Sequence, residues 1–478
     1  MELSDLLFLL SLLGKAVCLW FVLVAAAGMA RRRPAFPACA PKHKFAVLAA
    51  ARNEQDVIGG FVQSLREQSY PSALFDVYVL PNNCTDHTAQ AARNAGAQVL
   101  DCPPSVRCKG DALHYAIARL LAEQPGYDAF CVFDADNQPE PGFLARMNDA
   151  FCSGAQVAKG RIAAQNPTGS WVAGCYGLYF KLFDWFFSAP RAALGLSAKL
   201  VGTGFAVHRQ VLERLGGWNT HTLAEDAEFA AQCAQLGIQV AWVPGAVTRD
   251  VQPLGFSTSL TQRRRWISGI MQAGKTKLPT LARAKNWRAV DSVFFFLSPF
   301  AGAVGAILSA LGAALALARG GLPFWALAAG AAAGYFALTA LACALRLTQP
   351  QNERAGWGTV FGFALFMACW APLETYSLVR PVRRWKPIAH GQAARLPHHR
   401  KRRPSPAERL SKPGAALLLN CKRPRARQGM IPLPARGLYN CNLAAVIIFS
   451  KETPAAADAW GWKRTRQGVR PPVPCPHR

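Results

Sequence analysis

Two aspartates stand where a strongly apolar stretch ends. The segment Phe130–Asn137 reads FCVFDADN, so mostly apolar residues suited to a buried strand run directly into Asp134 and Asp136. This spacing lets both carboxylates face one cation at the end of the strand, and hard oxygen ligands suit Mg²⁺ or Mn²⁺. Such ions commonly neutralise the diphosphate of a nucleotide substrate. By itself such a pair is more often an ordinary turn, so the interpretation depends on the rest of the chain.

Polar residues follow two earlier apolar stretches in the same way. The predicted strands Phe45–Ala51 and Phe75–Leu80 end at Arg52–Glu54 and at Asn82–Asp86. Short apolar runs alternate with amphipathic helices over residues 45–251, a pattern typical of an α/β domain with a mostly parallel sheet. Ligands of such sheets bind at the carboxyl ends of the strands. We therefore expect the three polar clusters to meet at one edge of the sheet.

Further segments carry residues suited to chemistry or binding. Lys109–Gly110 opens a predicted helix, Val201–Phe205 is a glycine-hinged loop, and Glu225–Leu236 is a helix with an acidic first turn. Acidic residues at that place can also simply complement the helix dipole. The basic segment Gln262–Trp266 is ambiguous by itself, because a lipid-facing or solvated patch has the same composition.

Long apolar segments flank the α/β region. Leu6–Ala30 contains one charged residue, Lys15, and is followed by Arg31–Arg33, which predicts a transmembrane helix with the next segment in the cytosol. The aromatic segment Tyr176–Phe187 suits the bilayer surface. Three later runs are long and apolar enough to be spans: residues 292–318, 320–345 and 355–373.

These four spans conflict with the positive-inside tendency. They leave the basic stretch Arg380–Lys386 on the outer side of the membrane. Either one apolar segment is re-entrant or interfacial, or a further short span exists.

Composition divides the chain into four parts. The sequence has 478 residues, 51% of them apolar, and a net charge of +27, more than half of which lies in residues 391–478. We expect this basic tail to be disordered or only locally structured. The fourteen cysteines lack any Cys-x-x-Cys pair, which favours reduced structural thiols. The predicted parts are an N-terminal transmembrane helix with its basic stop (1–33), an α/β domain with interfacial elements (40–286), C-terminal transmembrane helices (287–380) and the tail (391–478).

Taken in order, these motifs resemble the membrane-bound family 2 glycosyltransferases, the group of cellulose, chitin, hyaluronan and poly-N-acetylglucosamine synthases. The resemblance spans about residues 45–266, and its motifs are specific only in combination. The matching residues are Ala51–Glu54, Asn82–Asp86, Lys109–Gly110, Asp134–Asp136, Gly202–Gly204, Glu225–Asp226 and Gln262-x-x-Arg265-Trp266.

The resemblance implies a GT-A fold, here a Rossmann-like cytosolic α/β domain inserted between transmembrane helices. It also implies transfer from a UDP-sugar with inversion at the anomeric carbon. Asn82 departs from the family, in which an aspartate commonly reads the uracil; an amide oxygen can still accept that hydrogen bond. The implied roles are a catalytic base at Asp226; nucleotide-sugar binding by Arg52, Glu54, Asn82, Lys109, Asp134 and Arg265; a Mg²⁺ or Mn²⁺ site at Asp134 and Asp136; and acceptor binding by Thr203, Gly204, Gln262 and Trp266.

Three functions remain open on the sequence. The leading hypothesis is a multi-pass synthase of the inner cell membrane that extends a polysaccharide at the cytosolic face. A second hypothesis is an enzyme that adds one sugar to a lipid acceptor, and a third is a catalytically dead scaffold whose basic tail recruits anionic partners. The expected partners are the UDP-sugar, a polysaccharide or lipid acceptor and the membrane, and no nucleic acid is expected.

Overall fold

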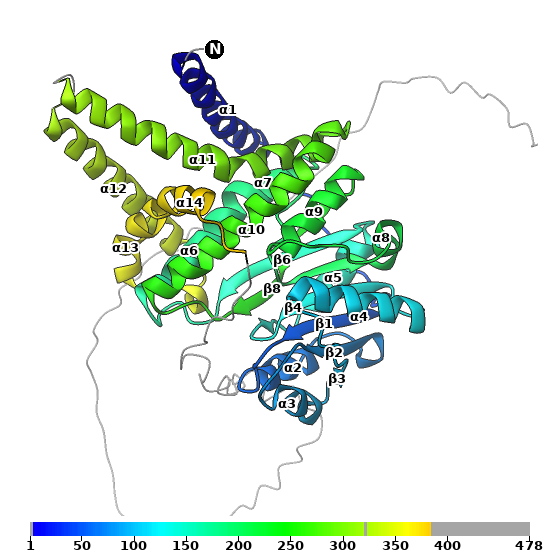
Figure 1. Ribbon diagram of the computed structural model, residues 1–478. Coiled ribbons are helices and arrows are strands. Elements are labelled where there is room, and N and C mark those ends of the chain that lie inside the picture. Colours follow the sequence, from blue (N-terminus) through cyan, green and yellow to red (C-terminus); the bar gives the residue numbers. More distant parts are fainter. Residues whose placement is uncertain (1–2, 320–322, 384–478) are drawn as a thin grey trace, which may run out of the picture. The chain divides into compact units, whose positions relative to one another are not determined.

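The computed structural model describes residues 3–319 and 323–383. Within these residues an eight-stranded mixed sheet has the strand order β3-β2-β1-β4-β7-β6-β8-β5 (Figure 1). The strands are β1 (Phe45–Ala51), β2 (Phe75–Pro81), β3 (Gln98–Val99), β4 (Ala129–Asp134), β5 (Gln138–Pro139), β6 (Val157–Ala164), β7 (Phe205–His208) and β8 (Val240–Asp250).

The sheet has a parallel half and a mixed half. Strands β3, β2, β1 and β4 are parallel to one another, as the sequence predicts. β7 is antiparallel to both β4 and β6, β8 is parallel to β6, and β5 is antiparallel to β8. Since β1, β2 and β4 run in one direction, their polar carboxyl ends lie at the same edge of the sheet.

Two hydrophobic cores lie on opposite faces of this sheet, because successive strand residues point to opposite sides. In β1, Phe45 and Val47 belong to one core and Ala46 and Leu48 to the other. Helices α2 (Ile58–Arg66), α3 (Thr88–Ala95) and α5 (Phe143–Cys152) cover the first core, and α4 (Lys109–Glu123), α8 (Arg209–Leu215) and α9 (Glu225–Gln235) cover the second.

A further group of helices connects the sheet domain to the apolar helices. It consists of α6 (Trp171–Phe183), a π-helical turn η2 (Asp184–Ser188), α7 (Ala189–Ala193) and α10 (Phe256–Arg283). Short 3₁₀ turns are η1 (Ser72–Leu74) and η3 (Gln351–Glu353). The aromatic segment expected at the bilayer surface is thus mostly α6 and η2.

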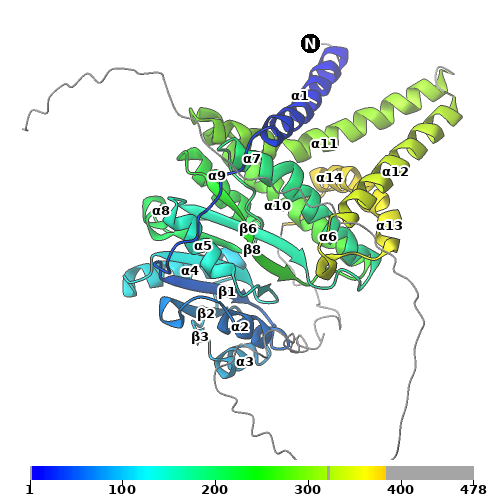
Figure 2. The ribbon, with the colours of Figure 1, turned by 180° about the vertical axis from the view of Figure 1, so that it is seen from behind.

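The long apolar helices project from the end of the domain where α6, α7 and α10 lie (Figures 1 and 2). They are α1 (Leu3–Met29), α11 (Trp287–Ala318) and α12 (Phe324–Leu347), followed by the shorter α13 (Trp357–Ala368) and α14 (Trp370–Val379). Three described stretches are long and apolar enough to cross a membrane: Trp287–Leu315, Phe324–Leu347 and Trp357–Val379.

The last of these stretches is two short helices that begin and end against the α/β domain. Before α13, Glu353 of η3 pairs with Arg161 of β6 through two N–O contacts of 2.7 Å. After α14, the backbone N–H of Val382 donates to Ser268 Oγ of α10 over 3.1 Å, and Gln272 Nε2 of α10 donates to the Val382 carbonyl over 2.6 Å. Both ends of the α13–α14 pair therefore lie on the same side as the sheet.

The cysteine expectation is wrong at one pair. Cys39, in the segment before β1, forms a disulfide with Cys152 at the end of α5, and their Cα atoms are 6.5 Å apart. The two residues are 113 positions apart in the sequence, so no local spacing signals the pair. The remaining described cysteines are free thiols. The basic tail, residues 391–478, lies outside the described residues.

Candidate active site

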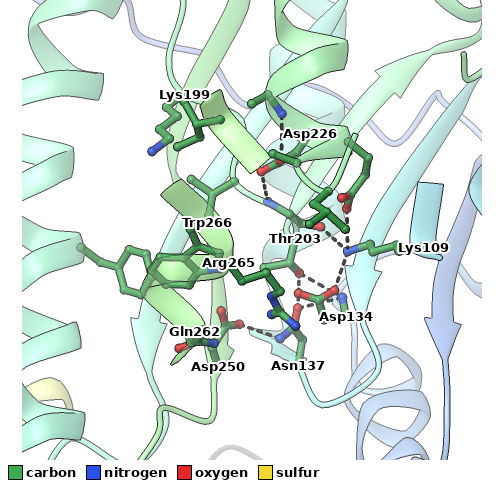
Figure 3. A pocket seen from close by; sticks show the side chains of 18 of the residues that line it. Lys109, Asp134, Asn137, Lys199, Thr203, Asp226, Asp250, Gln262, Arg265 and Trp266 are labelled. Atoms are coloured by element: carbon green, nitrogen blue, oxygen red, sulfur yellow. Dashed lines mark hydrogen bonds and ion pairs between the residues drawn. The ribbon is translucent and has the colours of Figure 1, made fainter. Parts of the chain in front are cut away.

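A cavity of about 250 Å³ lies where the sheet edge meets α9 and α10 (Figure 3). The cavity is lined by residues from the ends of β4 and β8, the start of α4, the loop before β7 and the first turn of α9. Helices α6, α10 and α14 also contribute to its lining. Of the residues that the sequence predicts for the site, the cavity brings together Lys109, Asp134, Asp136, Thr203, Asp226, Gln262, Arg265 and Trp266.

Lys109 and Asp134 form the polar centre of the cavity. Lys109 is the first residue of α4, and its Nζ lies 2.5 Å from Asp134 Oδ1 at the end of β4. The same Nζ donates to the Gly202 carbonyl and lies 3.9 Å from Glu225 Oε1. Burial lowers the pKa of Lys109, but Asp134 and Glu225 outweigh burial and leave the pKa raised. Lys109 is therefore a fixed ammonium inside the cavity.

The Glu225 carboxyl is also perturbed. Burial raises its pKa to about 7, and the positive charge of Lys109 only partly offsets that effect.

Asp136 and Asp250 lie side by side across one amide group. Asn137 Nδ2 donates to Asp136 Oδ1 over 3.2 Å and to Asp250 Oδ1, at the end of β8, over 2.6 Å. Burial, followed by the negative charges of Asp136 and Asp134, raises the pKa of Asp250 well above its usual value. Two carboxylates that repel each other in this way are favourable neighbours for a cation.

The donor set suits one class of metal ion. The described residues contain no group of three His, Cys, Asp or Glu side chains placed to hold an ion. Mg²⁺ and Mn²⁺ do not require a complete protein cage, because one or two carboxylates with substrate phosphates and water complete their shell. Asp134, Asp136 and Asp250 all supply carboxylate oxygens here, although Asp134 Oδ1 pairs with Lys109 and both Asp136 and Asp250 accept from Asn137 Nδ2.

Asp226 is held rigidly in the first turn of α9. Its Oδ2 accepts a hydrogen bond from the Gly202 N–H over 2.6 Å, and its Oδ1 accepts from the Ala227 N–H over 2.8 Å. Each carboxylate oxygen retains lone-pair capacity after one such bond. The side chain is thus oriented, lines the cavity and can accept a proton from a bound hydroxyl.

Thr203 and Gly204 differ in what they contribute. Thr203 lines the cavity, and its Oγ1 accepts from the Asp134 N–H over 3.2 Å, so it positions the end of β4. Gly204 does not line the cavity, and its φ of +64° together with the close approach of the Thr248 side chain favours glycine there. Its role in the structure is to shape the loop before β7.

The predicted α10 residues face the cavity from one helix. Gln262, Arg265 and Trp266 all line it, as i, i+3 and i+4 spacing on a helix allows. Gln262 Oε1 is buried without a hydrogen-bond partner among the described residues, which makes it available to a ligand hydroxyl. Burial lowers the pKa of Arg265, partly offset by Asp134 and Glu225.

Aromatic side chains form the opposite wall of the cavity. Tyr179, Phe180 and Phe183 of α6 and Trp370 of α14 line it beside Trp266. The rings of Tyr179 and Trp370 stack with centroids 5.4 Å apart. This wall is apolar, whereas the wall formed by the strand ends is charged.

Three predicted residues lie behind the cavity. Arg52 Nη2 donates to Asn82 Oδ1 over 2.8 Å and to the Arg107 carbonyl over 2.8 Å, and Asn82 is only 4% exposed. Asn82 Oδ1 also accepts from Asn83 Nδ2. The backbone N–H of Glu54 donates to Thr88 Oγ1. Arg52 and Asn82 thus support the loop that leads to Lys109, and none of the three lines the cavity.

Sequence reasoning missed Asp250, Lys199 and Trp370. Asp250 ends a strand, as Asp134 does. The apolar run that begins at Val240 and ends at polar residues could therefore have identified Asp250 as a candidate site residue. Lys199 and Trp370 belong to a loop and to an apolar segment without a motif, so only the fold brings them to the cavity.

The fold and domain match known proteins. Residues 129–348 match the family model described as "Glycosyl transferase family group 2". The matched residues are just under half of the chain. The fold is similar to that of a mannosyltransferase from Pyrobaculum calidifontis, which was solved in complex with GDP-Man and Mn²⁺. The TM-score is 0.54 at 18% sequence identity, and the match covers 78% of this chain and 99% of the mannosyltransferase chain. The expected GT-A fold is confirmed.

Curated relatives of the domain have different descriptions. The probable glycosyltransferase YdaM of Bacillus subtilis is 29% identical over 278 residues, 56% of this chain and 64% of the relative. A beta-monoglucosyldiacylglycerol synthase of Synechocystis is 30% identical over 237 residues, 48% of each chain. Cellulose synthase 1 catalytic subunit of Komagataeibacter xylinus is 23% identical over 257 residues, 48% of this chain and 33% of the relative. This chain therefore spans from a third to just under two thirds of these relatives' lengths.

Proposed function

We propose that the chain is an inverting glycosyltransferase that moves one sugar from a UDP-sugar to a lipid acceptor at the membrane face. The observation that carries the proposal is a single cavity with a charged wall and an aromatic wall, and with Asp226 between them. We call the wall of Lys109, Asp134, Asp136, Asp250 and Arg265 the donor side. We call the wall of Tyr179, Phe183, Trp266 and Trp370 the acceptor side.

The donor side is suited to a diphosphate. Lys109 and Arg265 supply cationic donors, and arginine favours forked contacts with phosphate oxygens. Asp136 and Asp250 would hold a divalent cation, and such an ion stabilises the negative charge that develops on the departing nucleoside diphosphate. The predicted uracil contact of Asn82 requires its side chain to exchange its present hydrogen bonds, because Asn82 Oδ1 already accepts from Arg52.

Asp226 takes the role of general base. The acceptor hydroxyl attacks the anomeric carbon from the face opposite the leaving group, its oxygen forms the new bond, and the bond to the diphosphate oxygen breaks. The hydroxyl proton passes to Asp226, which is assistance typically worth about 10² to 10⁴ in rate. The backbone contacts from Gly202 and Ala227 keep the carboxylate oriented for this transfer.

The acceptor side favours a lipid over a growing polysaccharide. A synthase that exports its polymer requires the cavity to continue between its spanning helices. None of the described residues of α1, α11 and α12 lines this cavity. Its apolar wall comes from α6, α10 and α14, and the α13–α14 pair starts and ends on the sheet side. We infer that α13–α14 is re-entrant, which also places Arg380 and Arg383 on the cytosolic side, as the positive-inside tendency requires.

The second candidate function is the polysaccharide synthase that the sequence analysis favours. Trp266 on the acceptor side supports this function, because sugar faces stack on indole rings.

Product size separates the two functions. Membranes that contain the chain are incubated with a panel of labelled UDP-sugars and, as a nucleobase control, GDP-mannose. The proposal predicts one added sugar on an extractable lipid from a UDP-sugar. A ladder of polymer supports the second candidate, and absence of transfer from all donors contradicts both.

A further inference from the structure

Lys199 places a charge on the acceptor side without a partner in the protein. It lies in the loop between α7 and β7, and its Nζ is 4.8 Å from the ring centre of Phe183 and 5.0 Å from that of Phe295. No described residue forms a hydrogen bond or ion pair with it. The aromatic rings stabilise the ammonium weakly, since cation–π attraction does not replace a counter-ion.

An ammonium in such a setting is unfavourable without a ligand. Burial lowers the pKa of Lys199 to about 8, and Asp226 offsets that effect only in part. Removing a charge from water is costly unless the charge is paired and hydrogen-bonded. The position is therefore compatible with a site that a negatively charged ligand completes.

Two carboxylates near Lys199, those of Asp291 and Asp184, do not pair with it. Asp291 of α11 accepts from Arg191 over 2.8 and 2.9 Å and from Trp20 Nε1 over 2.9 Å. Burial raises the pKa of Asp184 of η2 to about 7, and Lys159 is the main positive charge that partly offsets this effect. Neither carboxylate lies within ion-pair distance of Lys199.

Lys199 is also separate from the donor side. Figure 3 shows Lys199 and Lys109 on opposite sides of Asp226. The charge of Asp226 raises the pKa of both lysines, whereas that of Asp134 is a major influence on Lys109 alone. A diphosphate bound against Lys109 therefore leaves Lys199 without a counter-charge.

We propose that Lys199 binds the phosphoryl group of the acceptor, and that the acceptor is a phospholipid whose headgroup carries a free hydroxyl. This inference rests on the proposed function. The hydroxyl would face Asp226, the phosphoryl oxygens would contact Lys199, and the acyl chains would extend along Phe183 and Trp370 toward the bilayer. A charge-assisted contact of this kind contributes to acceptor recognition but not to donor binding.

The test uses the full chain in nanodiscs that contain either phosphatidylglycerol, which has a hydroxyl and a phosphate, or diacylglycerol, which has only the hydroxyl. Lys199→Met, Lys199→Arg and the exposed control Lys42→Met are compared with the unaltered chain. We expect Lys199→Met to raise the apparent KM for phosphatidylglycerol about tenfold and leave diacylglycerol transfer unchanged. Lys199→Arg, which keeps the charge, should retain most of the activity, and UDP binding should stay constant throughout.

Several outcomes overturn the assignment. One is that the unaltered chain transfers sugar to diacylglycerol but not to phosphatidylglycerol. Another is that Lys199→Met loses transfer to both lipids equally, and a third is that Lys199→Met has no effect on either. Transfer to neither lipid with normal binding of the UDP-sugar overturns the phospholipid acceptor alone. Failure of the unaltered chain to bind any nucleotide sugar overturns the proposed function itself.

Discussion

The donor side and the acceptor side of the cavity are built in different ways. The donor side consists of short polar segments at strand ends and first helical turns, and hydrogen bonds from the loop before β7 hold two of them: the Gly202 N–H donates to Asp226, and Thr203 Oγ1 accepts from the Asp134 N–H. The acceptor side consists of side chains from three separate helices, α6, α10 and α14, which meet only through long-range packing. Hydrogen bonds thus hold the charged wall of the cavity in place, whereas helix packing forms its aromatic wall.

This difference predicts which kinetic or binding constant a substitution on each side should change. Changes on the donor side should reduce the rate or the metal-dependent binding of the nucleotide. Changes on the acceptor side should raise the KM for the acceptor and leave nucleotide binding alone.

The largest effect is expected for Asp226→Asn. The amide retains the shape of the side chain but cannot take the acceptor proton, so kcat should fall by about 10² to 10⁴. Labelled sugar in the lipid fraction measures the rate, and calorimetry with UDP measures donor binding, which should stay close to that of the unaltered chain. The exposed Asp101→Asn is the matched control. Turnover near the unaltered rate would remove Asp226 from the base role.

A smaller effect is expected for the carboxylates beside Asn137. Asp136→Asn and Asp250→Asn each remove one charge from the proposed cation site, and we expect Mn²⁺-dependent UDP binding to weaken about 10- to 100-fold. Titration of UDP with and without Mn²⁺ measures this binding. Chelation of divalent metal should stop transfer by the unaltered chain. Equal UDP affinity with and without metal would show that the donor side works without a cation.

The smallest of these effects is expected for Trp370→Ala. Loss of the aromatic surface should raise the KM for the lipid acceptor about tenfold, which corresponds to roughly 1.4 kcal/mol, with little change in UDP binding. Trp325→Ala, at a position of α12 that is 72% exposed, is the matched control. A loss of UDP binding in Trp370→Ala would erase the distinction between the two sides of the cavity.

The sequence predicts the elements that carry most of the charged wall, Asp250 excepted, because their signals are local. Strand β1 has the predicted bounds, and α9 starts at the predicted acidic turn and is followed by Gly237 in the left-handed conformation. Short polar segments after apolar strands are visible in the sequence, and parallel strands bring their ends to one edge. The same reasoning placed Arg52 and Asn82 at that edge, but it could not show that Arg52 and Asn82 bond to each other instead of facing the cavity.

The sequence predicts the acceptor side poorly because its contacts are long-range. Trp370 and Lys199 have no motif, and the apolar run 355–373 does not show that this stretch divides into the two helices α13 and α14. The contacts that reveal this arrangement join residues far apart in the chain, such as Arg161 with Glu353. The disulfide of Cys39 and Cys152 escaped prediction for the same reason.

A structure of the full chain with an intact UDP-sugar and Mn²⁺ tests the account most directly. It predicts the diphosphate between Lys109 and Arg265, the ion against Asp136 and Asp250, and the anomeric carbon turned toward Asp226 and the aromatic wall. A sugar nucleotide bound outside this cavity, or bound with its anomeric carbon turned away from Asp226, would contradict the shared site on which the proposed transfer depends.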